Sequence, residues 1–456
     1  MTTRVLVPAG VLGLGFWPEA LKRGLAAGCD IICIDGGSTD SGPHSLGTGT
    51  SKYSRASCKA EWRMLMQARA QAGVPLVIGT AGTCGTDTTV DWMYEITREL
   101  AAELGQELTI ARLYSSQPKG RVAAALAAGR VHSLDPAPEV DAAALEGMSN
   151  IVALAGAEQI QAALATGADI VIAGRTTDTA TVAALPRMRG EHPGACWHGA
   201  KIAECGALCS THPTSGVVMV SFDATGFTVE PMADAAACTP HSVSAHMLYE
   251  NTDPFRLLEP GGHLDVTDAT YTALDPRRVR VEGSVWVPGR YTVKLEGARL
   301  AGYQTTLLAI LRDARYVANA RAWTERLSGY LRTEIGERLG LNAAAYTIEF
   351  RLIGIDAALG ALERRQGTPV EVGVLCLITA ATHEAADEIG RLVNPFLLHF
   401  PLTDDEPLPT FAFPYSPAQT NRGALYEFAL NHVMELDDPM DAFRLDVTEL
   451  AHADAG

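Results

Sequence analysis

The segment Ile31-Ile-Cys-Ile-Asp-Gly-Gly-Ser-Thr-Asp40 joins an uninterrupted apolar run to a loop of glycine, hydroxyl and carboxylate residues. A short apolar run without polar alternation is typical of a strand that is buried on both faces of a parallel sheet. The glycines that follow favour an abrupt turn out of the strand. This segment therefore predicts an α/β fold with a polar loop at the carboxyl end of a strand.

The same pattern recurs through the first half of the chain. Further strands are predicted at Val5–Val7, Leu76–Ile78, Leu108–Leu113 and Asp169–Ala173. Amphipathic helices are predicted between and beside them at Pro18–Ala27, Cys58–Ala72, Val90–Leu104 and Ala157–Ala165. Alternation of strands and helices indicates a mostly parallel, three-layer domain with helices on both faces of the sheet.

The second half follows a different pattern. Antiparallel strands are predicted at Val217–Phe222, Thr228–Glu230, Val279–Val281, Tyr291–Leu295, Tyr346–Ile353 and Val370–Thr379. Helices are predicted at Thr305–Ala314 and Glu384–Val393. Because the change of pattern falls at Ser210–Gly216, a stretch suited to a linker, we expect an α/β domain over residues 1–212 and an α+β domain over residues 213–456.

Charge and cysteine content limit the classes of partner. The 456 residues carry 36 basic and 53 acidic side chains, a formal charge of −17, which disfavours nucleic acids and anionic membranes. No apolar run approaches the ~18 residues of a membrane span, and the run at Val5–Val7 is too short for a signal peptide. Nine scattered cysteines are typical of reduced thiols. We expect a cytoplasmic protein with no nucleic acid or membrane partner.

Four polar loops follow predicted strands, and ligands of open α/β sheets bind at the carboxyl ends of strands. These loops are Asp35–Asp40, Gly79–Asp87, Tyr114–Ser116 and Gly174–Asp178. We expect them to converge on one site. Its candidate catalytic residues are Asp35, Asp40, Asp87, Arg175 and Asp178, and its candidate ligand-binding residues are Gly36, Gly37, Ser38, Thr39, His44, Gly82, Thr83, Ser115 and Thr176.

The chemistry of these residues leaves alternatives open. The planar fork of Arg175 suits a substrate carboxylate, or it forms an ion pair with Asp178 at i+3. Asp35 and Asp40 suit a general base, a divalent cation or the capping of their own loop. His44 belongs to an anion-binding loop or is a solvated histidine. No cofactor other than that divalent cation is predicted.

A second group of polar residues lies in the segment Trp197–Cys209. If the segment is helical, His198, Lys201, Cys205 and Cys209 share one face, and Glu204 can pair with Lys201. Lys201 and Glu204 are therefore further catalytic candidates, while the cysteines can equally be small buried hydrophobes. The spacing is not that of a zinc site, and we predict no metal ligands here.

The loop Gly10-Val-Leu-Gly-Leu-Gly15 has the order GxxGxG, whereas a dinucleotide-binding turn needs GxGxxG. A nicotinamide cofactor is therefore not predicted. The motifs GxxxxGK[ST], GxSxG and HExxH do not occur.

Several segments together resemble the acyclic terpene utilisation AtuA family. They are Asp169–Asp178, Glu204–Ala207, Leu248–Pro254, Tyr291–Lys294 and Gly302-Tyr303, in an order that runs to about residue 400. The resemblance implies catabolism of branched acids and their CoA thioesters, with a lyase or hydratase role. The loops at Asp35–Asp40 and Gly79–Gly85 depart from the family pattern, so the substrate need not be a terpenoid.

We therefore expect a lyase that acts on a small hydroxy or unsaturated carboxylate, or on its CoA thioester. The alternative is a non-catalytic scaffold that binds an acyl ligand. Relatives carry or accompany a ferredoxin-like domain, and the acidic end of this chain leaves no room for one, so a separate small ferredoxin-like subunit is expected. A homo-oligomer is also expected: the aromatic segments Phe396–Pro401 and Phe411–Tyr415 suit an interface, and they suit equally a loop that packs on its own domain. Tyr249, Glu250 and Asp253 are expected in a buried joint between the two domains.

Overall fold

The computed structural model describes residues 2–451, which form two compact units. Unit 1 contains the described chain up to Arg299 and again from Phe428 onward. Unit 2 is the intervening segment Leu300–Glu427. The second unit is therefore an insertion in the first.

Unit 1 is built on a ten-stranded sheet whose centre is parallel. The parallel strands, in spatial order, are β1 (Thr3–Val7), β2 (Ile31–Asp35), β3 (Leu76–Gly79), β7 (Ile170–Ala173) and β4 (Leu108–Tyr114). The five ranges match the predicted strands to within one or two residues, and the four polar loops follow β2, β3, β4 and β7 at one edge of the sheet. The predicted α/β class is confirmed.

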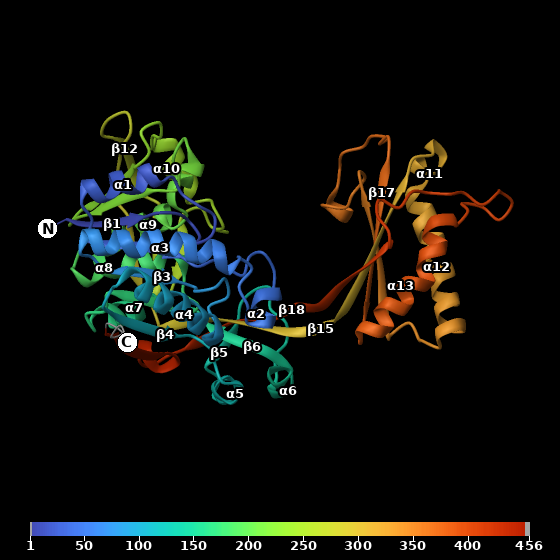
Figure 1. Cartoon of the computed structure of the whole chain (residues 1–456), viewed down its shortest axis with the longest axis horizontal. Coiled ribbons are helices and arrows are strands. Elements are labelled where there is room, and N and C mark those ends of the chain that lie inside the picture. Colours follow the sequence, from blue (N-terminus) through green and yellow to red (C-terminus); the bar gives the residue numbers. More distant parts are fainter. Residues whose placement is uncertain (1, 452–456) are drawn as a thin grey trace. The chain divides into compact units, whose positions relative to one another are not determined.

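Helices cover both faces of this sheet (Figure 1). One face carries α1 (Pro18–Ala27), α3 (Arg55–Ala72) and α4 (Asp87–Leu104). The other carries α7 (Ala157–Leu164), α8 (Asp178–Met188) and α9 (Pro193–Ala203). Successive residues of β2 alternate between the two cores: Ile32 and Ile34 pack on the first, and Ile31 and Cys33 on the second. Burial on both faces explains why this strand lacks polar residues.

Antiparallel strands extend the sheet at both edges. Beyond β1 lie β8 (Val218–Phe222), β9 (Gly226–Pro231), β13 (Val279–Glu282) and β12 (Thr270–Ala273), and beyond β4 lies β19 (Arg444–Leu450). Because β8 pairs with β1 from Thr3↔Phe222 to Val7↔Val218, the chain after residue 212 continues the first domain's sheet. The predicted boundary at 212/213 therefore needs correction. The change of pattern there marks a change of strand direction, and Ser210–Gly216 is a turn-rich connection.

Smaller elements complete unit 1. They are α2 (His44–Thr48), α5 (Lys119–Ala127), β5 (Val131–Ser133), α6 (Ala142–Glu146), β6 (Met148–Ala153), η1 (Gly206–Cys209), η2 (Pro213–Ser215), α10 (Pro240–His246), β10 (Arg256–Glu259), β11 (Gly262–Asp265), β14 (Val285–Pro288) and η4 (Pro439–Ala442). Strands β10, β11 and β14 form a separate antiparallel sheet. A small core joins β5 and β6 to the parts of β15 and β18 that belong to unit 1.

Unit 2 has the strand and helix order βαββαβ. Its elements are β15 (Thr292–Leu311), α11 (Ala314–Ala318), α12 (Ala320–Leu339), β16 (Tyr346–Ile353), η3 (Gly360–Leu362), β17 (Val372–Ala380), α13 (His383–His399) and β18 (Gln419–Glu435), with β15 entering from unit 1 and β18 returning to it. The spatial order β16-β17-β15-β18 is that of the ferredoxin-like motif. The chain thus contains such a unit itself, so the reason for expecting a separate ferredoxin-like subunit no longer holds.

The prediction of a helix at Thr305–Ala314 is wrong. Residues Tyr303–Leu311 pair with β17 as an antiparallel strand. A short apolar run does not distinguish a buried helix from a strand, and here the hydrogen bonds to β17 decide the conformation. The helix begins only at Ala314.

The aromatic segments of unit 2 pack within the unit. Phe411 lies with its ring centroid 5.2 Å from that of Trp323, and Phe400 is buried beside Tyr330. Most of this aromatic surface therefore serves the core of unit 2. Among residues 2–451, no helix combines the length and apolar character that a membrane crossing requires.

Trp323 provides a test of the core of unit 2. It is fully buried, and its indole Nε1 donates a hydrogen bond to the carbonyl oxygen of Phe400 at 2.8 Å. Trp323→Phe should lower the free energy of unfolding by about 2–4 kcal/mol, since it leaves a cavity and an unpaired carbonyl. Trp17→Phe, at a residue 42% exposed, should change it by less than about 0.5 kcal/mol. Urea denaturation followed by circular dichroism would measure both, and equal effects would contradict this view of the core.

Candidate functional site

A cavity of about 490 Å³ lies at the carboxyl ends of β1 and β2, beside the start of α8. We call it cavity A. Among the buried residues of its lining is Asp35, and Cys205 and Asp178 in the same lining are half-buried. Its exposed lining includes the apolar side chains of Leu14, Leu208 and Tyr249 together with the charged side chains of Asp40, Lys52 and Glu250. The cavity therefore offers polar groups at depth and apolar contacts near solvent.

A second cavity of about 550 Å³, cavity B, adjoins the first. Ser38, Asp40, Asp178 and Glu250 line both cavities. The remaining polar lining of cavity B is Thr39, Arg175, Lys294, Glu296 and Asn431. The structure therefore brings the loops of Asp35 and Arg175 together, as predicted.

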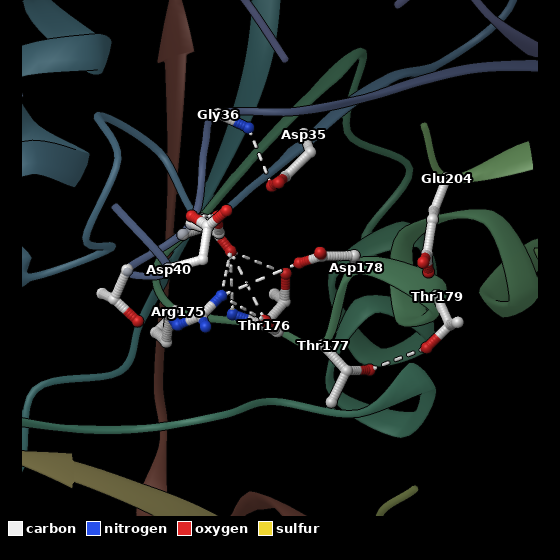
Figure 2. Close-up of polar contacts among 12 residues, drawn as sticks. Asp35, Gly36, Asp40, Arg175, Thr176, Thr177, Asp178, Thr179 and Glu204 are labelled. Atoms are coloured by element: carbon white, nitrogen blue, oxygen red, sulfur yellow. Dashed lines mark hydrogen bonds and ion pairs between the residues drawn. The ribbon is translucent and has the colours of Figure 1, made fainter. Parts of the chain in front are cut away.

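Asp35 and Asp178 share cavity A but differ in their surroundings. Figure 2 shows their carboxyl groups turned toward the same space, with the guanidinium of Arg175 next to Asp178. Burial and the charge of Asp178 raise the pKa of Asp35 well above its usual value, although Arg175 and the Gly36 N–H oppose this. Burial also raises the pKa of Asp178, against the cations of Arg175 and Lys201. At least one of the two carboxyls thus holds its proton at a higher pH than a solvated aspartic acid does.

Lys201 and Glu204 form a buried ion pair behind the cavity. Lys201 Nζ lies 2.6 Å from Glu204 Oε1, and both residues are about 5% exposed or less. Burial, with the negative charges of Asp178 and Glu259, raises the pKa of Glu204 to about 8 despite the neighbouring Lys201. The single ammonium group of Lys201 cannot balance the charges of Glu204, Asp178 and Glu259 together, so the pKa of Glu204 stays above its usual value.

The guanidinium of Arg175 forms an ion pair with Glu296, a residue that the sequence analysis did not predict in the site. Its Nε and Nη2 lie 3.1 and 3.3 Å from the two carboxylate oxygens of Glu296 on β15, whereas Nη1 is 3.7 Å from Asp178. Burial alone would raise the pKa of Glu296, but Arg175, Lys294 and the Thr39 hydroxyl lower it to about 2. The proposed contact of Arg175 with a substrate carboxylate therefore needs correction, because its fork already binds Glu296. The predicted strand Tyr291–Leu295 stops one residue before Glu296, so the alternation Lys294-x-Glu296 along the longer strand β15 is the signal that would have indicated it.

The glycines of the polar loops allow one loop to lie against another. A Cβ at Gly36 would come within 2.6 Å of the Thr80 carbonyl oxygen, and one at Gly37 within 2.9 Å of Thr83 Cα. Gly82 lies against Thr89 in the same way, at 2.8 Å. These glycines therefore serve contacts within the protein, and not the approach of a ligand as predicted.

The other predicted residues line neither cavity. Asp87 Oδ1 accepts a hydrogen bond from Ser116 N at 3.0 Å, so Asp87 does not join Asp35 and Arg175 as expected. The Ser115 hydroxyl donates to the Arg175 carbonyl at 3.0 Å. Thr83 and Thr176 are fully buried in their loops. His44 is exposed at the first residue of α2.

The segment Trp197–Cys209 is only partly helical. Helix α9 ends at Ala203, so Cys205 and Cys209 do not share a helix face with His198. His198 is fully buried between the hydroxyls of Ser284 and Tyr271, and burial lowers its pKa to about 3. Within residues 2–451, no three His, Cys, Asp or Glu side chains are arranged to hold a metal ion.

The glycine loop after β1 binds a carboxylate of the protein itself. Gly13 N donates to Glu61 Oε2 at 2.7 Å, and the Gly15 N–H also faces this carboxylate. These two N–H groups of the loop are therefore engaged by a carboxylate of α3.

Tyr249 and Glu250 lie at the cavities and not in a buried joint. Tyr249 is 40% exposed, and Glu250 is exposed with a φ of +51°. The expectation of a buried contact between domains is therefore wrong. Positive φ at a residue other than glycine is a strained conformation that is typical of functional positions.

Fold and site together define an α/β protein with buried carboxyls at the carboxyl edge of a parallel sheet. The family model described as acyclic terpene utilisation family protein AtuA matches residues 48–189 and 199–403. Since this covers more than half of the 456 residues, the chain belongs to that family. No curated protein and no solved structure matches the chain.

Gly85 tests the packing of the loops. Its φ is +60°, and a Cβ there would lie 2.1 Å from the Arg175 backbone N. Gly85→Ala should destabilise the protein by about 3 kcal/mol or more, since strain and overlap add. Gly105→Ala, at a φ of +63° with open space, should cost only about 1 kcal/mol. Thermal unfolding of both variants would measure the difference, and equal losses would rule out the loop contact as the cause.

Glu259 makes the stability of the folded protein depend on pH. Burial raises its pKa to about 7 although the hydroxyls of Thr177 and Thr179 donate to it. The unfolded chain releases this proton near pH 4.5 and the folded chain near pH 7, so Glu259 costs no stability below pH 4.5 and up to about 3 kcal/mol above pH 7. Glu259→Gln should therefore flatten the fall in stability between these values. Denaturation at a series of pH values would test it, and an unchanged slope would contradict the assignment.

Proposed function

We propose that the protein is a lyase of the hydratase type that acts on a small hydroxy or unsaturated acyl compound, as the carboxylate or its CoA thioester. The observation that carries this proposal is the pair Asp35 and Asp178. Two carboxyls with raised pKa line one cavity, and Asp178 is the one that lies 3.7 Å from the guanidinium of Arg175. Carboxyls whose environments differ in this way can divide the roles of acid and base.

The roles follow from the surroundings of each carboxyl. Asp178, beside Arg175 and within the field of Lys201, is the better carboxylate and would remove the proton from the carbon next to the carbonyl group. Asp35 is 5% exposed, retains its proton more readily, and would donate it to the departing hydroxyl, which leaves as water. The reverse sequence adds water across the double bond.

The substrate's apolar body would contact the exposed lining of cavity A. Leu14 is 68% exposed and Leu208 43% exposed, and both line that cavity. Burial of such side chains against an acyl chain would contribute roughly 25 cal/mol per Å² of apolar surface. This apolar lining also suits the alternative, a scaffold that binds an acyl ligand without reaction. We favour the enzyme because a binding module gains nothing from carboxyls that are costly to bury.

We place this activity in carboxylic acid catabolism in the cytoplasm. All nine cysteines are unpaired thiols, which suits a reducing compartment. We also propose a homo-oligomer, supported by large apolar side chains of unit 2 that are 69% (Val370) and 71% (Leu408) exposed.

Substitution of the two aspartates tests the proposal. Incubation with a panel of 3-hydroxyacyl and 2-enoyl compounds, as free acids and CoA thioesters, should show gain or loss of water by mass spectrometry. Asp35→Asn and Asp178→Asn should each lower kcat by about 100-fold or more, since each removes one proton-transfer group. Asp405→Asn, at an exposed residue of unit 2, serves as the control. No change in any compound of the panel, or variants as active as the control, would overturn the proposal.

A further inference from the structure

We infer that the site accepts the acyl group in an uncharged form and excludes the free carboxylate. This inference rests on the proposed function and narrows it to a thioester, ester or amide carbonyl. It is carried by the positions and partners of the charged side chains around the two cavities.

The cations of cavity B are already engaged by the protein. Arg175 holds both oxygens of Glu296, and Lys294 Nζ lies 3.2 Å from Glu296 Oε1. Behind the cavities, Lys201 is paired with Glu204 at 2.6 Å. A substrate carboxylate at Arg175 or Lys201 would therefore have to displace a carboxylate of the protein, and one at Lys294 would have to share the ammonium group with Glu296.

Cavity A contains one cation, Lys52, in its lining. This residue is exposed, and its Nζ donates to the Ser41 hydroxyl at 3.1 Å. Three carboxyl side chains line both cavities and outnumber this cation: Asp40, Asp178 and Glu250. The balance of charge in the shared lining is therefore negative.

Carboxylates in the lining of a cavity favour the binding of a neutral group over that of an anion of the same shape. A substrate carboxylate entering the cavities would lose hydration and gain repulsion from these carboxyls, and the exposed Lys52, hydrogen-bonded to the Ser41 hydroxyl, is the cation of cavity A that opposes this repulsion. A neutral carbonyl oxygen of the same shape loses far less and can accept a hydrogen bond. Discrimination by an unfavourable contact with the wrong ligand is a common source of specificity.

Glu250 is the residue whose position best fits this role. It is exposed, lines both cavities and has a φ of +51°, so a strained backbone presents a carboxylate at the opening. It is a specificity residue in this proposal and takes no part in the transfer of protons.

Crotonamide and crotonate test the inference, because they have nearly the same shape and differ in charge at neutral pH. Isothermal titration of the full chain should show crotonamide binding at least about tenfold more tightly than crotonate. Glu250→Gln should narrow this ratio severalfold, and Glu325→Gln, an exposed carboxylate on α12 that lines neither cavity, should leave it unchanged. High salt should also narrow the ratio, since it screens the repulsion.

Each outcome decides the inference. Crotonate binding as tightly as crotonamide, failure of both to bind, or a ratio insensitive to Glu250→Gln would overturn it. Hydration of crotonyl-CoA, followed separately by mass spectrometry, reports on the proposed lyase function. If crotonamide binds selectively but no thioester is turned over, the inference about charge is supported and the proposed lyase function is overturned.

Discussion

The buried ion pair of Arg175 and Glu296 is the interaction on which the site depends. The Arg175 backbone N donates to the Gly85 carbonyl at 3.0 Å, and its own carbonyl accepts from Ala155 N at 2.9 Å and from the Ser115 hydroxyl at 3.0 Å. The main chain of one residue therefore connects the loops after β3, β4 and β6, while its side chain reaches β15. A buried guanidinium without a carboxylate partner would be strongly unfavourable, so this arrangement requires Glu296.

The pairing has a consequence for the remaining charges. With Arg175 committed to Glu296 and Lys201 to Glu204, the other carboxyls around the cavities have few cations to balance them. Burial then raises the pKa values of Asp35, Asp178 and Glu259, and protons take the place of cations. Carboxyls placed in this way lower stability at neutral pH, a cost that proteins bear mainly where chemistry requires it.

The antiparallel strands explain how so long a chain is organised. β8 and β9 extend the parallel sheet beyond β1, so these later strands enlarge the existing sheet of unit 1 and do not form a new sheet. The βαββαβ unit begins with β15 and ends with β18, and each of these two strands belongs partly to unit 1 and partly to unit 2. Lys294 and Glu296 lie on the first of these strands, and Leu430 and Asn431, which also line cavity B, lie on the second.

The sequence by itself determined the parallel strands and the polar loops at their carboxyl ends. Runs such as Ile31–Ile34 and Ile170–Ala173 are apolar on both faces because both faces are buried, a local property that a sequence records directly. Only the tertiary structure decided the partner of Arg175, which lies 121 residues away, the strand at Thr305–Leu311, and the loop contacts that require Gly36 and Gly85. These depend on contacts between distant segments, and local composition carries no information about which segments will meet.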